Sequence, residues 1–127
     1  MVVYLGIVGS DRRWWKDGDE RKVKELIRRI VRYWVRKYGD VMVVTGDCPY
    51  GGVDEWTVEV CKELGVKVRV VRSEGWGWKY WKVRNRRIAE LVEALYCIDK
   101  KGREWSGGRW TMREAKRLGK WVKLIEV

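Results

Sequence analysis

The feature that most constrains the fold of this chain is a regular alternation between two kinds of segment. Five short runs are rich in apolar residues, and the first of them is continuously apolar and β-branched, as a strand buried on both faces is. They are VVYLGIV (2–8), VMVVTG (41–46), VKVRVV (66–71), ALYCID (94–99) and WVKLIEV (121–127). The segments between these runs are polar or amphipathic, which favours strands separated by helices and loops.

The first of the intervening segments has the clearest helical pattern. In residues 20–38, apolar side chains recur at steps of three and four and define one face of a helix. Asp19 is expected to cap its start and Gly39 its end. The other helices are expected within GVDEWTVEVCKELG (52–65, ending at Gly65), VRNRRIAELV (83–92) and TMREAKRLG (111–119), with loops at SEGWGWKYWK (73–82) and KKGREWSGG (100–108).

Strands that alternate with helices form parallel sheets covered on both faces. The chain is therefore predicted to be an α/β protein with one Rossmann-like domain over residues 1–127. We expect three α/β/α layers and a five-stranded parallel sheet in the order 3-2-1-4-5. The hydrophobic fraction of 46% and the charged fraction of 37% exclude a disordered chain. No apolar run approaches the roughly 20 residues of a membrane span, so we expect no membrane partner and a cytoplasmic location, in the host cytoplasm if the source is a virus.

Cysteine and histidine usage bears on metal chemistry. Histidine is absent, and Cys48, Cys61 and Cys97 are far apart with no CxxC pair, so we expect neither a metal site nor a cofactor. Cys61 and Cys97 are expected in the core and Cys48 in a loop. The chain has no Gln and a single Asn beside abundant Glu, Lys and Arg, which is typical of hyperthermophiles. In a protein from such a source, a disulfide between two of these cysteines is an alternative to free thiols.

In a parallel α/β sheet, ligands bind beyond the carboxyl ends of the strands, where the strand order reverses. Glycines and arginines gather at those ends in this sequence. Glycines let backbone amides approach a phosphate, and an arginine can bind a phosphate through two hydrogen bonds. Ser10 is expected to donate its hydroxyl to the same phosphate. The candidate ligand-binding residues are Gly9, Ser10, Gly46, Asp47, Gly51, Gly52, Asp54, Arg84, Asn85, Arg86, Gly107, Gly108 and Thr111.

Each of these segments also has a purely structural explanation. TGDCPYGGVD (45–54) is equally a strand-to-helix turn with Asp54 in the first helical turn. The arginines of VRNRRIAEL (83–91) are equally surface charge. In SGGRWTMRE (106–114), Thr111 and Glu114 have the spacing of a capping box, in which Thr111 caps the last helix and Glu114 reaches back to its backbone. A capping box does not require the adjacent glycines that precede it.

The order of these motifs, from residue 2 to 127, resembles the SLOG superfamily of Rossmann-like domains. Its members include small bacterial and phage proteins, the DNA-processing protein A (Smf) domain and the cytokinin-activating phosphoribohydrolases. The resemblance implies a nucleotide-binding fold. It is carried by Gly9-Ser10 after the first strand, by GGVD at the start of a helix, by RNRRI, and by GG…REAKRLGKWV after the fourth strand.

The function that we predict is the binding or sensing of a nucleotide or nucleotide derivative at the Gly-rich edge, with Arg86 countering charge. A second hypothesis is hydrolysis of an N-glycosidic bond. Phosphoribohydrolases carry PGGxGTxxE where this chain has SGGRWTMRE, with Ser106 and Trp110 in place of Pro and the third Gly. The resemblance implies Glu114 as the catalytic carboxylate, which would stabilise positive charge on the ribose, with Arg86 assisting it.

A third hypothesis is binding of DNA or RNA. The net charge is +11, and WGWKYWK (76–82) interleaves aromatic residues with lysines, as do stacking surfaces for bases. Trp14 and Trp15 form a second aromatic pair. The same aromatic residues also suit a lid or a homodimer interface. The cations of residues 20–38 also suit a solvated helix face.

Overall fold

One parallel sheet of five strands organises the protein, and the computed structural model describes all of residues 1–127. The strand order is β3-β2-β1-β4-β5, and every neighbouring pair is parallel. The predicted α/β class and strand order are therefore confirmed. The elements are β1 (Val3–Gly9), the short 3-10 helix η1 (Arg12–Trp14), α1 (Asp19–Tyr38), β2 (Val41–Gly46), α2 (Val53–Leu64), β3 (Lys67–Val71), α3 (Trp78–Leu91), β4 (Ala94–Asp99), α4 (Gly107–Arg117) and β5 (Trp121–Glu126).

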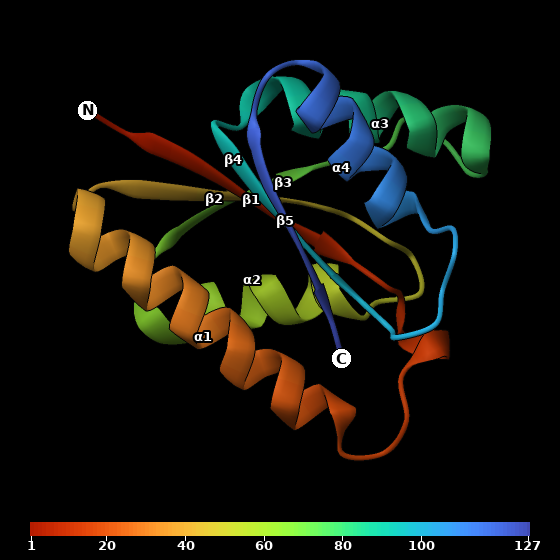
Figure 1. Ribbon diagram of the computed structural model, residues 1–127, viewed down its shortest axis with the longest axis horizontal. Helices are drawn as coiled ribbons and strands as arrows, with labels where there is room; N and C mark the ends of the chain where they lie inside the picture. The colour runs from red at the N-terminus through yellow and green to blue at the C-terminus, as the bar shows by residue number, and fades with distance from the viewer.

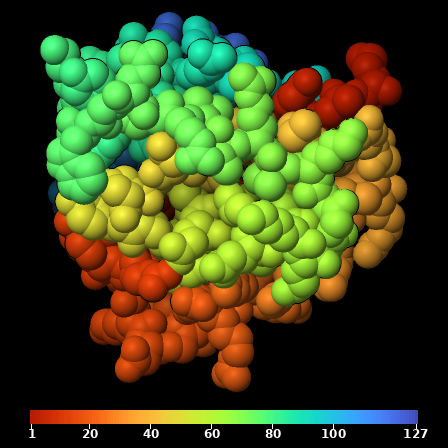
Figure 2. All heavy atoms as spheres, turned by 180° about the vertical axis from the view of Figure 1, so that it is seen from behind, coloured from red at the N-terminus to blue at the C-terminus, as the bar shows by residue number.

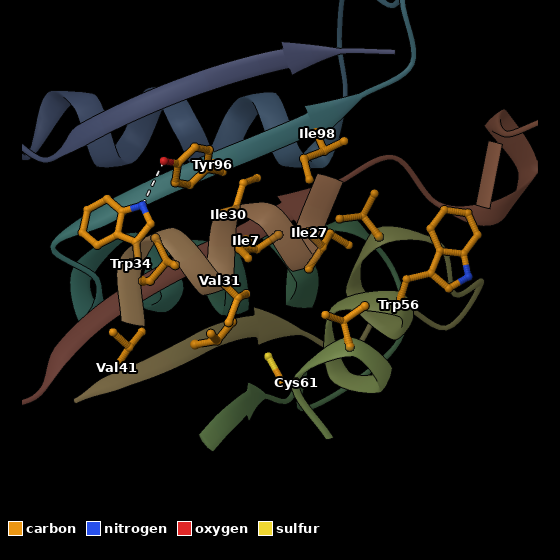
Figure 3. Close-up of a cluster of buried hydrophobic side chains, with 14 of the residues drawn as sticks. Ile7, Ile27, Ile30, Val31, Trp34, Val41, Trp56, Cys61, Tyr96 and Ile98 are labelled. Carbon is orange, nitrogen blue, oxygen red and sulfur yellow. Dashed lines mark hydrogen bonds between the residues drawn. The ribbon is translucent and has the colours of Figure 1, made fainter. Parts of the chain in front are cut away.

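The helices cover the sheet from both sides, α1 and α2 on one face and α3 and α4 on the other (Figure 1). Alternate residues of a strand point to opposite faces, so β4 supplies both cores. Tyr96 and Ile98 belong to the cluster under α1 and α2, whereas Leu95 and Cys97 belong to the cluster under α3 and α4. In the larger cluster the Trp34 indole donates a hydrogen bond of 2.9 Å to the Tyr96 hydroxyl (Figure 3).

The ends of the first two helices follow the sequence closely, with one correction. Gly39 and Gly65 end α1 and α2 at positive φ values of 83° and 68°, as expected of helix-terminating glycines. Asp19 does not cap α1 but is its first residue, after Gly18. Its carboxylate instead accepts hydrogen bonds from the Lys16 amide and the Lys100 ammonium.

Helices α3 and α4 begin earlier than the sequence pattern predicts. α3 starts at Trp78, because the Gly77 carbonyl accepts from the amides of Tyr80 and Trp81. Residues 78–82 are thus helical, and the prediction of a loop through 82 is wrong. α4 starts at Gly107, where the Ser106 hydroxyl accepts from the Arg109 amide at 3.0 Å.

The predicted capping box is also wrong. Thr111 lies inside α4 and donates its hydroxyl to the Gly107 carbonyl, so it caps nothing. Glu114 does not reach back to the Thr111 backbone but pairs with Arg117 at 2.8 Å. Ser106 takes the capping role because it is the residue that directly precedes the first helical turn.

The cysteines occupy the places that the sequence predicts. Cys61 and Cys97 are buried, Cys48 is half-buried, and all three are free thiols. No helix combines the length and the apolar character that a bilayer crossing requires.

Truncation of Ile27, which is fully buried between α1 and the sheet, tests the packing of the larger core. Ile27→Ala is expected to lower the free energy of unfolding by about 2–5 kcal/mol, because it removes buried methyl groups and leaves a cavity. The exposed Arg32→Ala on the same helix is the matched control and is expected to change it by less than about 0.5 kcal/mol. Equal effects of the two substitutions in urea unfolding would contradict this packing.

Candidate functional site

A cavity of about 360 Å³ lies at the carboxyl ends of the strands, within the size range of small-molecule sites. The loops after β1, β2 and β4 meet the first turns of α3 and α4 there. Figure 2 shows the segment after β2, in yellow, beside the start of α3, in green. The lining residues are Val8, Gly9, Asp11, Arg13, Trp14, Cys48, Pro49, Tyr50, Asp54, Trp78, Trp81, Arg84, Asn85, Arg103, Trp105, Ser106, Gly107, Gly108 and Thr111.

The structure divides the sequence-predicted ligand residues into two groups. Those that line the cavity are Gly9, Asp54, Arg84, Asn85, Gly107, Gly108 and Thr111. Those that do not line it are Ser10, Gly46, Asp47, Gly51, Gly52 and Arg86. Arg86 in the second group is an exposed residue of α3.

Asp99, the last residue of β4, does not line the cavity itself but bonds to Ser106, which does. It is fully buried, and its carboxylate accepts from the Ser10 hydroxyl, the Ser106 hydroxyl at 2.8 Å and the Arg109 guanidinium at 2.7 Å. Since the Ser10 proton is donated to Asp99, that hydroxyl has no proton left for a ligand phosphate. Ser10 also accepts from the Arg103 guanidinium at 3.2 Å.

A second polar cluster fixes Arg84 in the wall. Its guanidinium donates to the Asp47 carboxylate at 2.5 Å and to the Asn85 side-chain oxygen at 2.7 Å. Asp47 in turn accepts from the Ser73 amide, which ties the loop after β3 to the end of β2. Arg84 is buried and its charge is already balanced, so it shapes the cavity more than it offers free charge.

Asp54, in the first turn of α2, is the buried carboxyl group of the lining. Burial raises its pKa, although the nearby Arg84 charge acts in the opposite direction. It accepts from the Thr45 hydroxyl and from the Cys48 amide, both at 3.2 Å. These bonds hold the loop after β2 against α2, and the position of Asp54 in the first helical turn is one where the helix dipole favours an acid.

Most of the glycines at this edge allow neighbouring segments of the chain to approach their Cα atoms closely. A Cβ on Gly9 would lie 1.9 Å from the Ile98 carbonyl oxygen, and one on Gly108 would lie 3.1 Å from the Gly9 Cα. Gly52 has a φ of 86° and approaches the Ser10 backbone. Gly107 differs, because a Cβ there would make only ordinary contacts, with the Asn85 side chain at 3.5 Å and the Trp78 ring at 3.9 Å.

The start of α4 presents unpaired hydrogen-bond donors to the cavity. The amides of Gly107 and Gly108 donate to no acceptor in the protein, as expected for the first residues of a helix. Arg103 also lines the cavity, and its Nε is buried without a partner in the protein. Burial lowers the pKa of Arg103. These donors and the positive end of the helix dipole together favour an anion.

Aromatic rings form the opposite wall and the mouth of the cavity. Trp78 packs edge-on against Trp105, with ring centroids 5.2 Å apart, and against Trp110 at 5.5 Å. The Arg103 guanidinium lies 3.8 Å above the Trp14 ring, and Arg13 lies 3.6 Å above Tyr50. The Trp-rich segment is therefore part of the cavity.

Arg13 and Asp11 form a pair at the rim. Burial opposes ionisation of Asp11, but hydrogen bonds from the Arg13 side chain and backbone outweigh it and lower the pKa of the carboxyl group. Sequence reasoning missed both residues, and it missed Arg103. Only their position in loops that follow β1 and β4 could have indicated them.

Arg86 and Glu114, the two residues implied as catalytic, do lie together. Their side chains are 3.8 Å apart, and the Arg86 guanidinium lies 5.7 Å from the Trp110 ring centre. Neither residue lines the cavity, and the Arg86 side chain is 48% exposed. A hydrogen bond from Arg117 lowers the pKa of Glu114, which is therefore ionised at neutral pH. The pair links α3 to α4 outside the cavity.

Comparisons with known proteins find similar folds but no sequence relative. No protein-family model matches the sequence, and no curated protein does. The structure is similar to that of the molybdenum cofactor carrier protein from Chlamydomonas reinhardtii, with a TM-score of 0.68 and 16% identity over 98% of this chain and 76% of that one.

DNA processing protein A from Streptococcus pneumoniae is also similar, with a TM-score of 0.57 and 13% identity over 96% of this chain. The chain spans 58% of that protein's length. At 16% and 13% identity both similarities concern the fold alone, and they agree with the Rossmann-like fold predicted from the sequence.

Replacement of Asp99 tests whether this buried carboxylate holds the cavity wall together. Asp99→Asn leaves the Arg109 guanidinium without its buried counter-charge, so we expect the free energy of unfolding to fall by about 3–5 kcal/mol. The exposed Asp17→Asn is a matched control for loss of one carboxylate and is expected to be nearly neutral. Urea unfolding measures both, and a nearly neutral Asp99→Asn would show that Asp99 does not hold the wall.

Proposed function

We propose that the protein binds a nucleotide or nucleotide derivative in the cavity at the carboxyl ends of its strands. The observation that carries the proposal is the pairing of aromatic walls with unpaired donors in one space of about 360 Å³. A nucleotide has the matching chemistry, a flat aromatic base joined to an anionic phosphate. The position of the cavity also agrees with the rule that ligands of open α/β sheets bind at this edge.

The phosphate is assigned to the start of α4. The free amides of Gly107 and Gly108 are adjacent, and Arg103 faces the same space from the loop after β4. Backbone amides at a helix N-terminus bind phosphate through hydrogen bonds and through the helix dipole. The charge of Arg103 adds a contact that is stronger than one between neutral groups.

The base is assigned to the aromatic wall. Trp78 and Trp81, both on the first turn of α3, line the cavity with Tyr50 and Trp105. Stacking of a base on an aromatic side chain contributes about 1–3 kcal/mol. Among the structural neighbours, the carrier protein by its name carries a molybdenum cofactor, which supports the use of this fold to hold a small molecule.

We propose binding rather than glycosidic hydrolysis, because Arg86 and Glu114 lie outside the cavity. The carboxyl groups that do line it, Asp11 and Asp54, are engaged by Arg13 and by Thr45 and Cys48 respectively. Neither is therefore free to support a positively charged ribose in the way that the hydrolytic reaction requires.

A second candidate function is binding of single-stranded nucleic acid across the cavity mouth. The observation that favours it is the exposure of Trp76, Trp105 and Trp14, which are 65%, 51% and 47% accessible. Exposed rings beside arginines are the usual platform for single strands. In this arrangement the strand rests on the rim and the interior of the cavity stays empty.

A side chain placed at Gly107 tests the proposed site directly. Gly107→Leu replaces a glycine that is not at positive φ, and the new Cβ would make only ordinary contacts with Asn85 and Trp78, so we expect the protein to fold with unchanged or higher stability. The leucine occupies the phosphate position, so binding of AMP should weaken by more than about tenfold, which corresponds to 1.4 kcal/mol. Isothermal titration calorimetry measures the affinity, with ADP-ribose and a cyclic nucleotide as further ligands.

Arg86→Ala is the matched control, because it removes an arginine from α3 outside the cavity. We expect the affinity of this variant for AMP to equal that of the wild type. A loss of binding in Arg86→Ala, with full binding retained in Gly107→Leu, would move the site to the outer side of α3 and α4. It would restore the hydrolytic hypothesis.

The second candidate predicts a different response. A ten-nucleotide dT strand bound on the rim should retain its affinity in Gly107→Leu, and log Kd should rise steeply with log salt, by about 0.7 for each phosphate contacted. AMP in the cavity should show a much shallower slope. Fluorescence anisotropy of the labelled strand at several salt concentrations measures the slope, and no detectable binding at low salt would rule out this candidate.

A further inference from the structure

A second concave surface lies on the α1 side of the sheet, beside the edge strand β5. It is an open groove of about 870 Å³ between α1 and strands β4 and β5. Trp121 and Lys123 of β5 pair with Ala94 and Tyr96 of β4 and so point to the same face. Both residues are exposed, because no helix covers this face of β5.

The floor and one wall of the groove are aromatic. Trp34 and Tyr96 are joined by a hydrogen bond, and the Trp121 ring packs edge-on against Tyr96 at 5.3 Å. Trp121 is 49% exposed, Tyr33 is 51% exposed and Tyr38 is 44% exposed. The groove thus offers a continuous apolar surface to a partner, and surfaces of this kind mark interaction sites.

The charges on α1 differ between its two sides. On the side that faces α2, Lys24 pairs with Glu20 and Glu59, and Arg28 pairs with Glu25 and Glu63. On the side that faces the groove, no cation has a carboxylate partner. The groove cations are Arg29, Lys37 and Lys123, and none of them forms a salt bridge.

Only one carboxylate, that of Glu93, lines the groove. It accepts a hydrogen bond from the Tyr4 amide at 2.9 Å. The groove therefore carries three cations against one engaged acid. This imbalance is complementary to an anionic partner and repels a second copy of the same surface.

The backbone of β5 is the other open feature. β5 pairs only with β4, so the amides and carbonyls along its outer edge have no strand partner. A free edge of this kind accepts an added strand from another chain. The groove runs beside this edge, so alternate side chains of an added strand would point into it.

We propose that the groove between α1 and β5 binds an extended acidic segment of a partner protein, which adds a sixth strand to the sheet at β5. Apolar side chains of the segment pack on Trp121 and Tyr96, and its carboxylates pair with Lys37, Lys123 and Arg29. A peptide fits better than a nucleic acid, because the Lys37 ammonium lies over the rings of Tyr33 and Tyr38, at 5.7 and 5.5 Å, where a base would stack.

The probe for this site is the nine-residue peptide ETLTETLTE, in which glutamate and leucine alternate with threonine. We expect it to bind the full chain and to shift the amide signals of β5 and the Trp34 and Trp121 indole signals in a ¹⁵N NMR titration. The signals of Gly107 and Gly108 should stay in place, because they lie at the other cavity. The peptide KTLTKTLTK is the charge-reversed control and should not bind.

A charge-matched pair of variants locates the binding. Lys37→Glu with Lys123→Glu should weaken the affinity for ETLTETLTE by about tenfold or more. Arg113→Glu with Lys116→Glu makes the same change in net charge on the exposed side of α4 and should leave the affinity within about twofold.

Three results would overturn the proposal. One is no shift of β5 signals at millimolar peptide. A second is equal weakening by the two double variants, which would show attraction to net charge alone. A third is a shift of the same signals with protein concentration in the absence of peptide, or with dT strand but not peptide, which would assign the groove to a second copy or to nucleic acid.

Discussion

The buried carboxylate of Asp99 is the interaction on which the candidate site depends. β4 lies between β1 and β5, so its last residue emerges at the point where the strand order reverses. Asp99 joins the loop after β1 through Ser10, and it joins the start of α4 through Ser106 and Arg109. A fully buried carboxylate requires such partners, because an unpaired charge in the interior is strongly destabilising. The requirement for partners therefore fixes where α4 begins and turns its free amides toward the cavity.

The surplus positive charge of the chain does not lie in that cavity. Arg13 pairs with Asp11, Arg84 pairs with Asp47, and Arg109 pairs with Asp99, so the arginines at this edge are largely balanced. What the cavity offers an anion is a small set of directional donors. The unbalanced charge lies elsewhere on the surface, including the groove beside β5. A net charge of +11 therefore says little about the chemistry of either site.

The sheet and its ligand-binding edge could be predicted from the sequence because they depend on local patterns of apolar residues and glycines. Such patterns indicate the same structure in different folds. Apolar runs indicated the strands, and Gly39 and Gly65 marked the ends of α1 and α2, where both have positive φ. The start of α4 could not be predicted, since Ser106 and Thr111 are both plausible caps and only the position of Asp99 selects Ser106. The start of α3 could not be located because Trp and Tyr have only middling helix propensity and the glycines at 75 and 77 favour a loop. Arg103 has no motif at all and is brought to the cavity by the fold alone.

If the start of α4 and the aromatic wall together hold a ligand, both should respond to AMP in solution. In a ¹⁵N NMR titration of the wild-type chain with AMP, the account predicts saturable shifts of the Gly107 and Gly108 amides and of the Trp78 and Trp81 indole signals. The signals of β5 and of Arg86 should remain fixed. Shifts confined to Arg86 and Glu114, or no saturable shift at millimolar AMP, would contradict the account.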